Sequence, residues 1–286
     1  MKEKFDDVIK KVCSFHDLSC LGGRSLTEII PILSTFGIRT NPVLTVILSN
    51  HSEYEKFTYH DLTDHMIEQK EIWKEIGVKF DAFFSGFLGS PEQIEIVIEY
   101  IEEFNKEDSI VIVDPVMGDE GEFFPSISND MIYEMKKLVK KANVISPNWT
   151  EACFLAEYEY KENPTYDDLR IVLNRLKKLS CENIVISSFP SDDCSYISTI
   201  VYRSGELREI KNSFINKRYP GTGDAFSSVL LGGLLSGYDL FDATKIAVEF
   251  IEYSINFSKD YDYSEKQGIL LEACLPTLFK YNVFNK

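Results

Sequence analysis

The sequence lacks the residue patterns of three common kinds of site. Its four histidines form no HExxH motif, so catalysis by a histidine-bound metal is not expected. No GxxxxGK[ST] segment occurs, which excludes a P-loop nucleotide site. The cysteines form no CxxC pair and their spacing fits no zinc site, so we interpret them as reduced thiols. The six cysteines lie at positions 13, 20, 153, 181, 194 and 274.

Long apolar runs and positive charge are also scarce. No run approaches the roughly 20 residues of a membrane span, and Met1–Asp7 lacks a signal-peptide core, so we expect a cytoplasmic protein. The chain has 46 acidic and 30 basic residues, a net charge of −16. Such a surface repels nucleic acid and anionic membranes, so neither is an expected partner. It also repels polyphosphates, so a phosphate site here must depend on local dipoles and bound cations.

Hydrophobic residues are plentiful, which indicates a folded chain with a sizeable core. The 286 residues are 44% hydrophobic and include 20 Phe and 15 Tyr. Segments with strand-like composition alternate with amphipathic, helix-like segments. This alternation predicts a three-layer α/β fold, in which helices flank a central, mostly parallel sheet. Because no repeat or linker interrupts it, we predict one domain, residues 1–286.

The expected elements follow from the periodicity of the apolar residues. Pro31 is expected to bend or break the first helix. The expected strands are Val12–Phe15, Val43–Ser49, Ala82–Phe87, Ser109–Val113, Asn143–Ser146 and Asn183–Ser187, with a hairpin of Tyr196–Tyr202 and Leu207–Lys211. The expected helices are Ser25–Phe36, Leu62–Ile76, Pro91–Phe104, Asp130–Lys141, Trp149–Ala156, Tyr166–Leu179, Ala225–Leu235 and Phe241–Phe257.

Small, polar and acidic residues collect where these strands end. Ligands of open α/β sheets bind at the carboxyl ends of the strands, so we expect these side chains to converge on one cleft. They are Asp17, Asn50, His51, Ser85, Asp114, Asp119, Asn148, Glu151, Ser187 and Ser188.

The most informative segment is Gly221–Phe226, a Gly-Thr-Gly-Asp turn that opens an apolar helix. Such a turn can point free backbone N–H groups at an anion, and the helix dipole adds to the attraction. Asp224 would stand beside that anion. A carboxylate is unfavourable there unless it accepts a proton from an attacking hydroxyl during phosphoryl transfer. The alternative is structural, with Thr222 as helix cap and Asp224 favouring the dipole.

Three motifs in this order resemble the ribokinase superfamily, and in particular its pyridoxal (vitamin B6) kinase branch. They are Asp114-Pro115-Val116-Met117-Gly118-Asp119, Ser146-Pro147-Asn148 with Glu151, and Gly221-Thr222-Gly223-Asp224. The segments Thr45-Val46 with Ser49-Asn50-His51, Ser85–Ser90, and His16–Gly22 with Arg24–Thr27 resemble the substrate-side signatures of that branch. The resemblance spans about residues 10 to 258 and implies a ribokinase-like fold with a short flap, Gly118–Glu122, over the nucleotide.

The resemblance implies a role for each part of the Gly-Thr-Gly-Asp turn. Asp224 would be the catalytic base that takes the proton of the attacking hydroxyl. Gly221, Thr222 and Gly223 would bind the nucleotide phosphate and stabilise the developing charge through backbone N–H groups. Only glycine lets a backbone approach so closely.

The resemblance also implies an acidic side that organises Mg²⁺ and ATP. Asp114, Asp119 and Glu151 would hold Mg²⁺ directly or through water, as this oxygen-preferring ion requires. Asp114 and Asn148 would also bind the nucleotide, together with Ser187 and Ser188. The structural alternatives are a strand-end turn at Asp114 and a helix cap formed by Asn148 and Glu151. Members of this branch often need a monovalent cation such as K⁺, and a homodimer is implied.

On the substrate side, Ser14 resembles the residue that hydrogen-bonds the pyridine ring. Thr45, Phe87 and Leu21 resemble residues that line the ring pocket, although Phe87 could equally be a core residue. Asp17 is compatible with binding a ring substituent or with capping a turn. Lys217 and Arg218 lie close enough to the anion turn to reach phosphate, or they form a solvated basic pair.

The implied function is ATP-dependent phosphorylation of the 5′-hydroxymethyl group of pyridoxal, pyridoxine or pyridoxamine. One alternative is hydroxymethylpyrimidine kinase, a sister with the same fold; Ser19–Arg24 departs from its glycine-rich opening. A sugar kinase fits the substrate-side motifs less well. The other alternative is a non-catalytic B6-binding protein, against which the intact Gly-Thr-Gly-Asp turn speaks.

Overall fold

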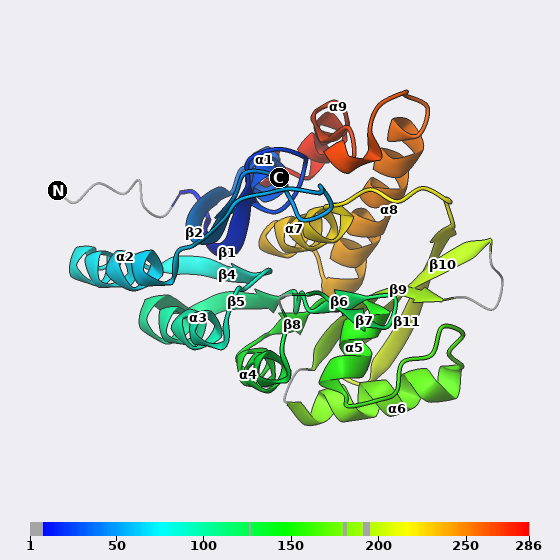
Figure 1. The fold of residues 1–286 in the computed structure, drawn as a ribbon, viewed down its shortest axis with the longest axis horizontal. Coiled ribbons are helices and arrows are strands. Elements are labelled where there is room, and N and C mark those ends of the chain that lie inside the picture. The colour runs from blue at the N-terminus through cyan, green and yellow to red at the C-terminus, as the bar shows by residue number, and fades with distance from the viewer. Residues whose placement is uncertain (1–7, 126, 180–181, 191–194, 286) are drawn as a thin grey trace.

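The fold is built on one large, mostly parallel sheet. The computed structural model describes residues 8–125, 127–179, 182–190 and 195–285. Within these residues the sheet has nine strands in the order β11-β10-β9-β8-β5-β4-β1-β2-β3 (Figure 1). The six central strands run parallel, whereas β3 at one edge and β10 and β11 at the other pair antiparallel. The strands are β1 (Lys11–Ser19), β2 (Arg39–Leu48), β3 (Tyr59–Asp61), β4 (Phe80–Ser85), β5 (Asn105–Val113), β8 (Val144–Ile145), β9 (Asn183–Pro190), β10 (Tyr196–Arg203) and β11 (Glu206–Ser213).

Helices cover both faces of the sheet and complete the three layers. On one face α1, α7, α8 and α9 pack together, and on the other face α2 to α6 follow one another (Figure 1). The helices are α1 (Leu26–Thr35), α2 (Thr63–Ile76), α3 (Pro91–Phe104), α4 (Asn129–Val139), α5 (Trp149–Leu155), α6 (Tyr166–Leu176), α7 (Thr222–Leu235), α8 (Leu240–Ser258) and α9 (Leu271–Cys274). This arrangement confirms the predicted three-layer α/β fold.

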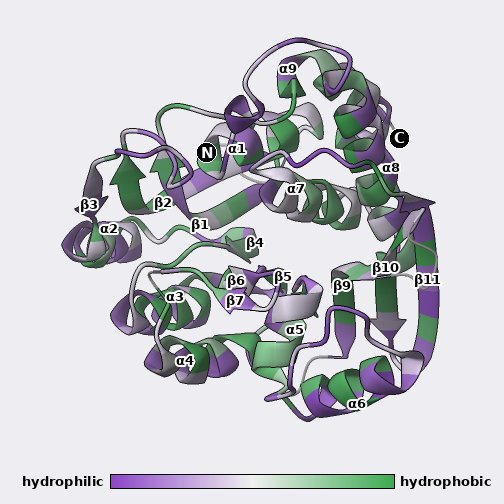
Figure 2. Ribbon diagram, turned by 45° about the vertical axis from the view of Figure 1, so that its right-hand side comes forward, coloured by the Kyte–Doolittle hydropathy of each residue, from purple (hydrophilic) through white to green (hydrophobic). Residues whose placement is uncertain are grey.

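Each face of the sheet carries its own hydrophobic core, which explains why the central strands are apolar on both sides. Phe83 and Val113 point into the core under α2 to α6, whereas Phe84 and Ile112 point into the core under α1, α7 and α8. Strands buried on both faces lose the alternation of polar and apolar residues. Figure 2 shows the contrast: hydrophobic residues fill much of β9 and β10, whereas the edge strand β11 is mostly hydrophilic, with Leu207 and Ile210 as its apolar residues.

Several elements differ from the sequence expectation. β1 continues past Phe15 to Ser19 because it still pairs with β2 there, Leu18 with Ile47 and Ser19 with Leu48. Its polar side chains bond to one another, as in the contact from Ser19 Oγ to Asp17 Oδ2 (2.8 Å). Pro31 does not break α1, whose residues Ile29 and Ile32 are fixed in the core. The three-residue strand β3 was not predicted, because so short an element carries too little periodicity, and neither were the 3₁₀ turns after α9, at Leu275–Tyr281 and Val283–Asn285.

Two further expectations concern cysteines and membranes. Cys13, Cys20, Cys153 and Cys274 are free thiols, as predicted, while positions 181 and 194 lie outside the described residues. No helix in the described part of the chain is both long enough and apolar enough to cross a bilayer.

Candidate active site

The site is centred on the turn that opens α7. Gly221 is the residue before the first helical turn, and its φ of 88° lies in the left-handed region that favours glycine. A Cβ atom at Gly221 would lie 2.5 Å from Glu28 Oε2 and 2.6 Å from the carbonyl oxygen of Gly23, so no other side chain fits. A Cβ at Gly223 would meet nothing within 4 Å. The turn is therefore closed on the Gly221 side and open at Gly223, where the first N–H groups of α7 can meet an anion.

Asp224 stands in the first turn of α7 and is linked to a second carboxylate by one serine. The backbone N–H of Ser25 donates to Asp224 Oδ2 at 3.0 Å. The Ser25 hydroxyl lies 2.5 Å from Asp17 Oδ1 and 3.4 Å from Asp224 Oδ2. Burial raises the pKa of Asp224 to about 6, while the nearby Arg24 lowers it and Asp17 raises it. A carboxylate with such a pKa is ionised at pH 7 and still basic enough to take a proton.

A second buried carboxylate, Asp114, lies at the end of β5. Its Oδ2 accepts a hydrogen bond from the hydroxyl of Ser227 in α7 (2.8 Å), and that hydroxyl is 3.1 Å from Ser146 Oγ. Burial raises the pKa of Asp114 to about 8, and the charge of Asp224 contributes to that rise. The fold thus places the carboxyl groups of Asp114 and Asp224 close together, and the hydroxyl groups of Ser146 and Ser227 lie between β5 and α7.

Glu151 and Asn148 lie one strand further along and form a helix cap. Asn148 Oδ1 accepts from the N–H of Glu151 at 2.8 Å, and Glu151 Oε2 accepts from the N–H of Asn148 at 2.9 Å. Glu151 Oε1 accepts from the N–H of Met117 at 3.1 Å. The structural alternative for this pair is therefore confirmed. Burial raises the pKa of Glu151 and the charge of Asp114 raises it further, which favours the protonated form of this carboxyl unless a cation lies nearby.

The acidic residues fit Mg²⁺ held mainly through water and phosphate. Within the described ranges, no three His, Cys, Asp or Glu side chains converge closely enough to bind a metal by themselves. Both oxygens of Glu151 accept a backbone N–H group, which fixes this carboxyl in the helix cap and leaves one lone pair on each oxygen for water or a metal. The raised pKa values of Asp114 and Glu151 mark buried carboxylates that a cation would stabilise. Mg²⁺ keeps several waters and uses one or two carboxylates, which matches this donor set.

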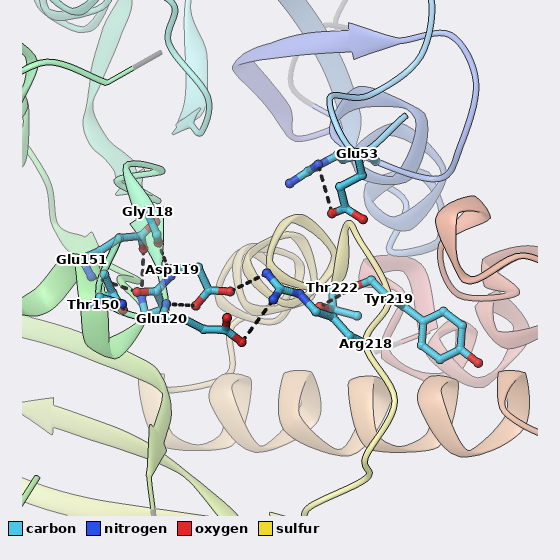
Figure 3. Close-up of polar contacts among 12 residues, drawn as sticks. Glu53, Gly118, Asp119, Glu120, Thr150, Glu151, Arg218, Tyr219 and Thr222 are labelled. Atoms are coloured by element: carbon cyan, nitrogen blue, oxygen red, sulfur yellow. Dashed lines mark hydrogen bonds and ion pairs between the residues drawn. The ribbon is translucent and has the colours of Figure 1, made fainter. Parts of the chain in front are cut away.

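The predicted flap is a two-stranded hairpin of β6 (Gly118–Asp119) and β7 (Glu122–Phe123). Asn148 Nδ2 donates to the carbonyl of Gly118 at 2.8 Å, and Thr150 Oγ1 accepts from Gly121 at 3.0 Å. Figure 3 shows Arg218 reaching across to the same hairpin from the segment before Gly221. Its guanidinium contacts Asp119 Oδ2 at 2.9 Å and Glu120 Oε1 at 3.2 Å. Burial nevertheless raises the pKa of Asp119.

The residues predicted to contact substrate lie near the ends of β1, β2 and β4. Thr45 is buried and its hydroxyl donates to the carbonyl of Phe87 at 3.0 Å, which joins two predicted pocket residues. Ser14 is fully buried and lies 3.0 Å from His16 Nδ1. Asp17 is the predicted substrate residue that is linked to Asp224, because the hydroxyl group of Ser25 contacts both carboxyl groups. Leu21 is 56% exposed and does not line a closed pocket.

The remaining predicted nucleotide residues lie beside Asn148. Ser187 pairs with Asn148 across the neighbouring chain segments, and its N–H donates to the carbonyl of Pro147 at 3.0 Å. Ser188 has a φ of 55°, a value uncommon for a residue with a side chain. The structure thus brings Ser187 and Ser188 to the edge of the sheet that also holds Glu151.

Sequence reasoning missed three residues of this site. Ser25 and Ser227 form hydrogen bonds with the acidic groups. Glu28 is fully buried beneath Gly221, and neither of its carboxyl oxygens has a hydrogen-bond partner among the residues that the structure describes. Burial raises the pKa of Glu28, and the charge of Asp224 raises it further. Serines near helix starts carry no distinctive signal, but an acidic residue on the apolar face of α1 is a detectable anomaly.

Comparison with known proteins gives one family and relatives of two activities. The family model described as phosphomethylpyrimidine kinase matches residues 32–270. Pyridoxal kinase of Dictyostelium discoideum is 26% identical over 240 residues, which cover 78% of this chain and 77% of the relative. A hydroxymethylpyrimidine/phosphomethylpyrimidine kinase of Aquifex aeolicus is 26% identical over 242 residues, which cover 83% of this chain and 91% of the relative.

A solved structure is more similar. A Bacteroides thetaiotaomicron protein described as a phosphomethylpyrimidine kinase, in the crystal form with pyridoxal, has a TM-score of 0.90 and 39% identity. The match covers 94% of this chain and 96% of that chain. These comparisons confirm the resemblance predicted from the ordered motifs.

Proposed function

Because this chain belongs to the phosphomethylpyrimidine kinase family, we propose that it transfers the γ-phosphoryl group of ATP to the 5′-hydroxymethyl group of a vitamin B6 vitamer. The family and the relatives make the chain a phosphotransferase with an alcohol acceptor. The observation that carries the proposal is Asp224, a carboxylate with a pKa of about 6 in the first turn of α7, beside the glycine turn. The B6 substrate is supported by the similarity to the protein crystallised with pyridoxal.

In the proposed reaction Asp224 accepts the proton of the 5′-hydroxyl group while the oxygen of that hydroxyl group attacks the γ-phosphorus. The new O–P bond forms as the bond between the γ-phosphorus and the bridging oxygen breaks, and ADP leaves with that electron pair. The free N–H groups of Thr222 and Gly223 stabilise the charge on the transferred phosphoryl oxygens. Ser25 holds Asp224 in place through its backbone N–H, 3.0 Å away.

We assign Mg²⁺ to the acidic side, with Asp114 as ligand and with Glu151 and Asp119 acting through water. Bound there, the ion would neutralise part of the negative charge of the phosphates. Asn148, Ser187 and Ser188 would contact the nucleotide. A K⁺ requirement, a homodimeric state and action of residues 1–286 as one kinase unit are part of the proposal and rest on the resemblance.

The substrate pocket is proposed on the opposite side of Asp224. Thr45 and Phe87, joined by one hydrogen bond, would line the ring, and Leu21 would cover it when substrate binds. Asp17 would face a polar ring substituent, because its carboxylate is held 2.5 Å from the Ser25 hydroxyl that also contacts the base. Ser14, whose hydroxyl group contacts His16, would hydrogen-bond the pyridine ring.

Hydroxymethylpyrimidine is the second candidate acceptor, because the description of the Aquifex aeolicus relative names that activity. Both candidates are aromatic alcohols, so the same base and turn would serve either one. The departure at Ser19–Arg24 from the glycine-rich opening expected of that enzyme favours the B6 vitamers.

The test is ADP formation with Mg-ATP and a panel of acceptors: pyridoxal, pyridoxine, pyridoxamine, hydroxymethylpyrimidine and ribose. We expect turnover with at least one B6 vitamer and none with ribose. Faster turnover of hydroxymethylpyrimidine than of every vitamer would replace the proposed substrate. Equal ADP formation with and without acceptor would contradict the proposed transfer.

A further inference from the structure

Arg218 connects the flap to the anion turn, and the proposed chemistry leaves it without a role. It lies three residues before Gly221, in the segment that leads into α7. Its side chain is 63% exposed, and two of its nitrogens contact Asp119 and Glu120 at 2.9 and 3.2 Å (Figure 3). A guanidinium group has five N–H donors in a planar fork, so these two contacts leave donors free.

The charge of the cleft makes such a cation necessary for a polyphosphate. Carboxylates gather around the turn in the described part of the chain, and the chain as a whole carries a net charge of −16. The neighbouring cations have carboxylate partners of their own: Arg24 lies 3.7 Å from Glu53 and also lowers the pKa of Asp224, and Lys217 pairs with Glu265 of the C-terminal segment. The carboxylates of the cleft are Asp17, Asp114, Asp119, Glu120, Glu151 and Asp224.

We propose that Arg218 is a nucleotide-binding residue. When the nucleotide binds, the guanidinium group of Arg218 leaves Asp119 and Glu120 and contacts the phosphates. The inference rests on the proposed function, because it assigns the phosphates to the turn that Arg218 precedes. Without nucleotide, the two flap carboxylates hold the guanidinium between the flap and the turn. When nucleotide is bound, Arg218 contacts phosphate in place of Asp119, so the Asp119 carboxylate is free to act toward Mg²⁺.

The energetics favour this exchange of partners. An ion pair between side chains as exposed as these contributes little to stability, because water screens both charges. A forked, charge-assisted contact with a phosphate group is stronger, since the planar donors match two phosphate oxygens at once. Loss of one such contact is expected to weaken nucleotide binding about tenfold to a hundredfold.

The experiment is calorimetric titration of the full chain with ADP, with and without Mg²⁺, and no acceptor is needed. Arg218→Gln should weaken binding about tenfold to a hundredfold under both conditions. Lys217→Gln is the matched control, because it removes the same charge one residue away from a side chain paired with Glu265. It should change the affinity less than about threefold. Equal losses in the two variants, or no loss in Arg218→Gln, would overturn the proposal.

Glu120→Gln separates nucleotide binding from a purely structural role of Arg218. If Arg218 only fastened the flap, loss of its partner Glu120 would loosen the flap and weaken ADP binding. The proposal predicts the opposite sign: Glu120→Gln removes one of the two carboxylates that compete with phosphate for the guanidinium, so affinity should stay the same or increase. A wild-type chain that binds ADP but phosphorylates no acceptor would contradict the proposed function and leave the role of Arg218 standing.

Discussion

Replacement of Asp224 by asparagine tests the proposed chemistry at a single atom. The asparagine side chain would keep the size of the aspartate and could still accept the N–H of Ser25, which lies 3.0 Å from Oδ2. It could not accept a proton from the acceptor hydroxyl. We therefore expect Asp224→Asn to abolish most turnover while leaving the affinity for both substrates within a few fold.

The size of the loss follows from the role of a general base. A positioned base contributes about 10² to 10⁴ in rate, which corresponds to roughly 2.7 to 5.4 kcal/mol of transition-state stabilisation. Because the pKa of Asp224 is about 6, the wild-type rate should fall as the pH drops below about 6 and the carboxylate becomes protonated. The variant has no such group, so this acid limb should disappear.

The assay is the pH dependence of kcat/KM for the acceptor from about pH 5 to 8, with Mg-ATP at saturation. Asp242→Asn is the control, since Asp242 is an exposed acid in the first turn of another helix, α8. It should leave the profile unchanged. If Asp224→Asn kept more than about a tenth of the wild-type turnover, or kept the acid limb, Asp224 would not be the base.

Three further predictions concern the surroundings of Asp224. Arg24→Ala should move the acid limb of the pH profile to higher pH, because Arg24 lowers the pKa of Asp224. Glu53→Ala removes the partner of Arg24 and should not move the limb. An acid limb at the same pH in both variants would refute the assigned cause. Glu28→Gln should stabilise the chain increasingly as the pH rises above about 4.5: burial raises the folded pKa of Glu28, so the wild type loses stability once the unfolded chain ionises. Thermal unfolding at about pH 5 and pH 8 measures this, and a pH-independent difference would contradict it. Gly221→Ala should lower the unfolding free energy by about 1 to 3 kcal/mol, because φ is 88° and its Cβ would lie 2.5 Å from Glu28; an unchanged denaturant midpoint would contradict this.

Much of the fold could be predicted because long periodic segments dominate it. The apolar runs that end at Val113 and Ile186 each predicted a central strand, since strands buried on both faces need no polar residues. The hairpin around Ser204-Gly205 followed from its turn residues. Elements of two or three residues, such as β3 and β8, are held by their neighbours in the sheet rather than by their own composition, so their bounds could not be read from the sequence.

The candidate site was predictable where chemistry marks a residue and unpredictable where only packing does. Asp114 and Asp224 were found because acids after a buried strand or inside a glycine turn are unusual. Ser25 was not, because its role depends on the approach of α1 to α7, which local sequence does not encode. Arg218 had a predicted reach toward phosphate, but its contacts with Asp119 and Glu120 depend on where the flap folds.

The most direct test of the central claim is internal competition between pyridoxal and hydroxymethylpyrimidine for limiting Mg-ATP, with the two phosphorylated products quantified together. The ratio of the products gives the ratio of kcat/KM without separate kinetics. The account predicts that pyridoxal 5′-phosphate predominates and that both products form at least about a hundredfold more slowly with Asp224→Asn. Predominance of hydroxymethylpyrimidine phosphate would contradict the assigned substrate, and abundant product from Asp224→Asn would contradict the assigned mechanism.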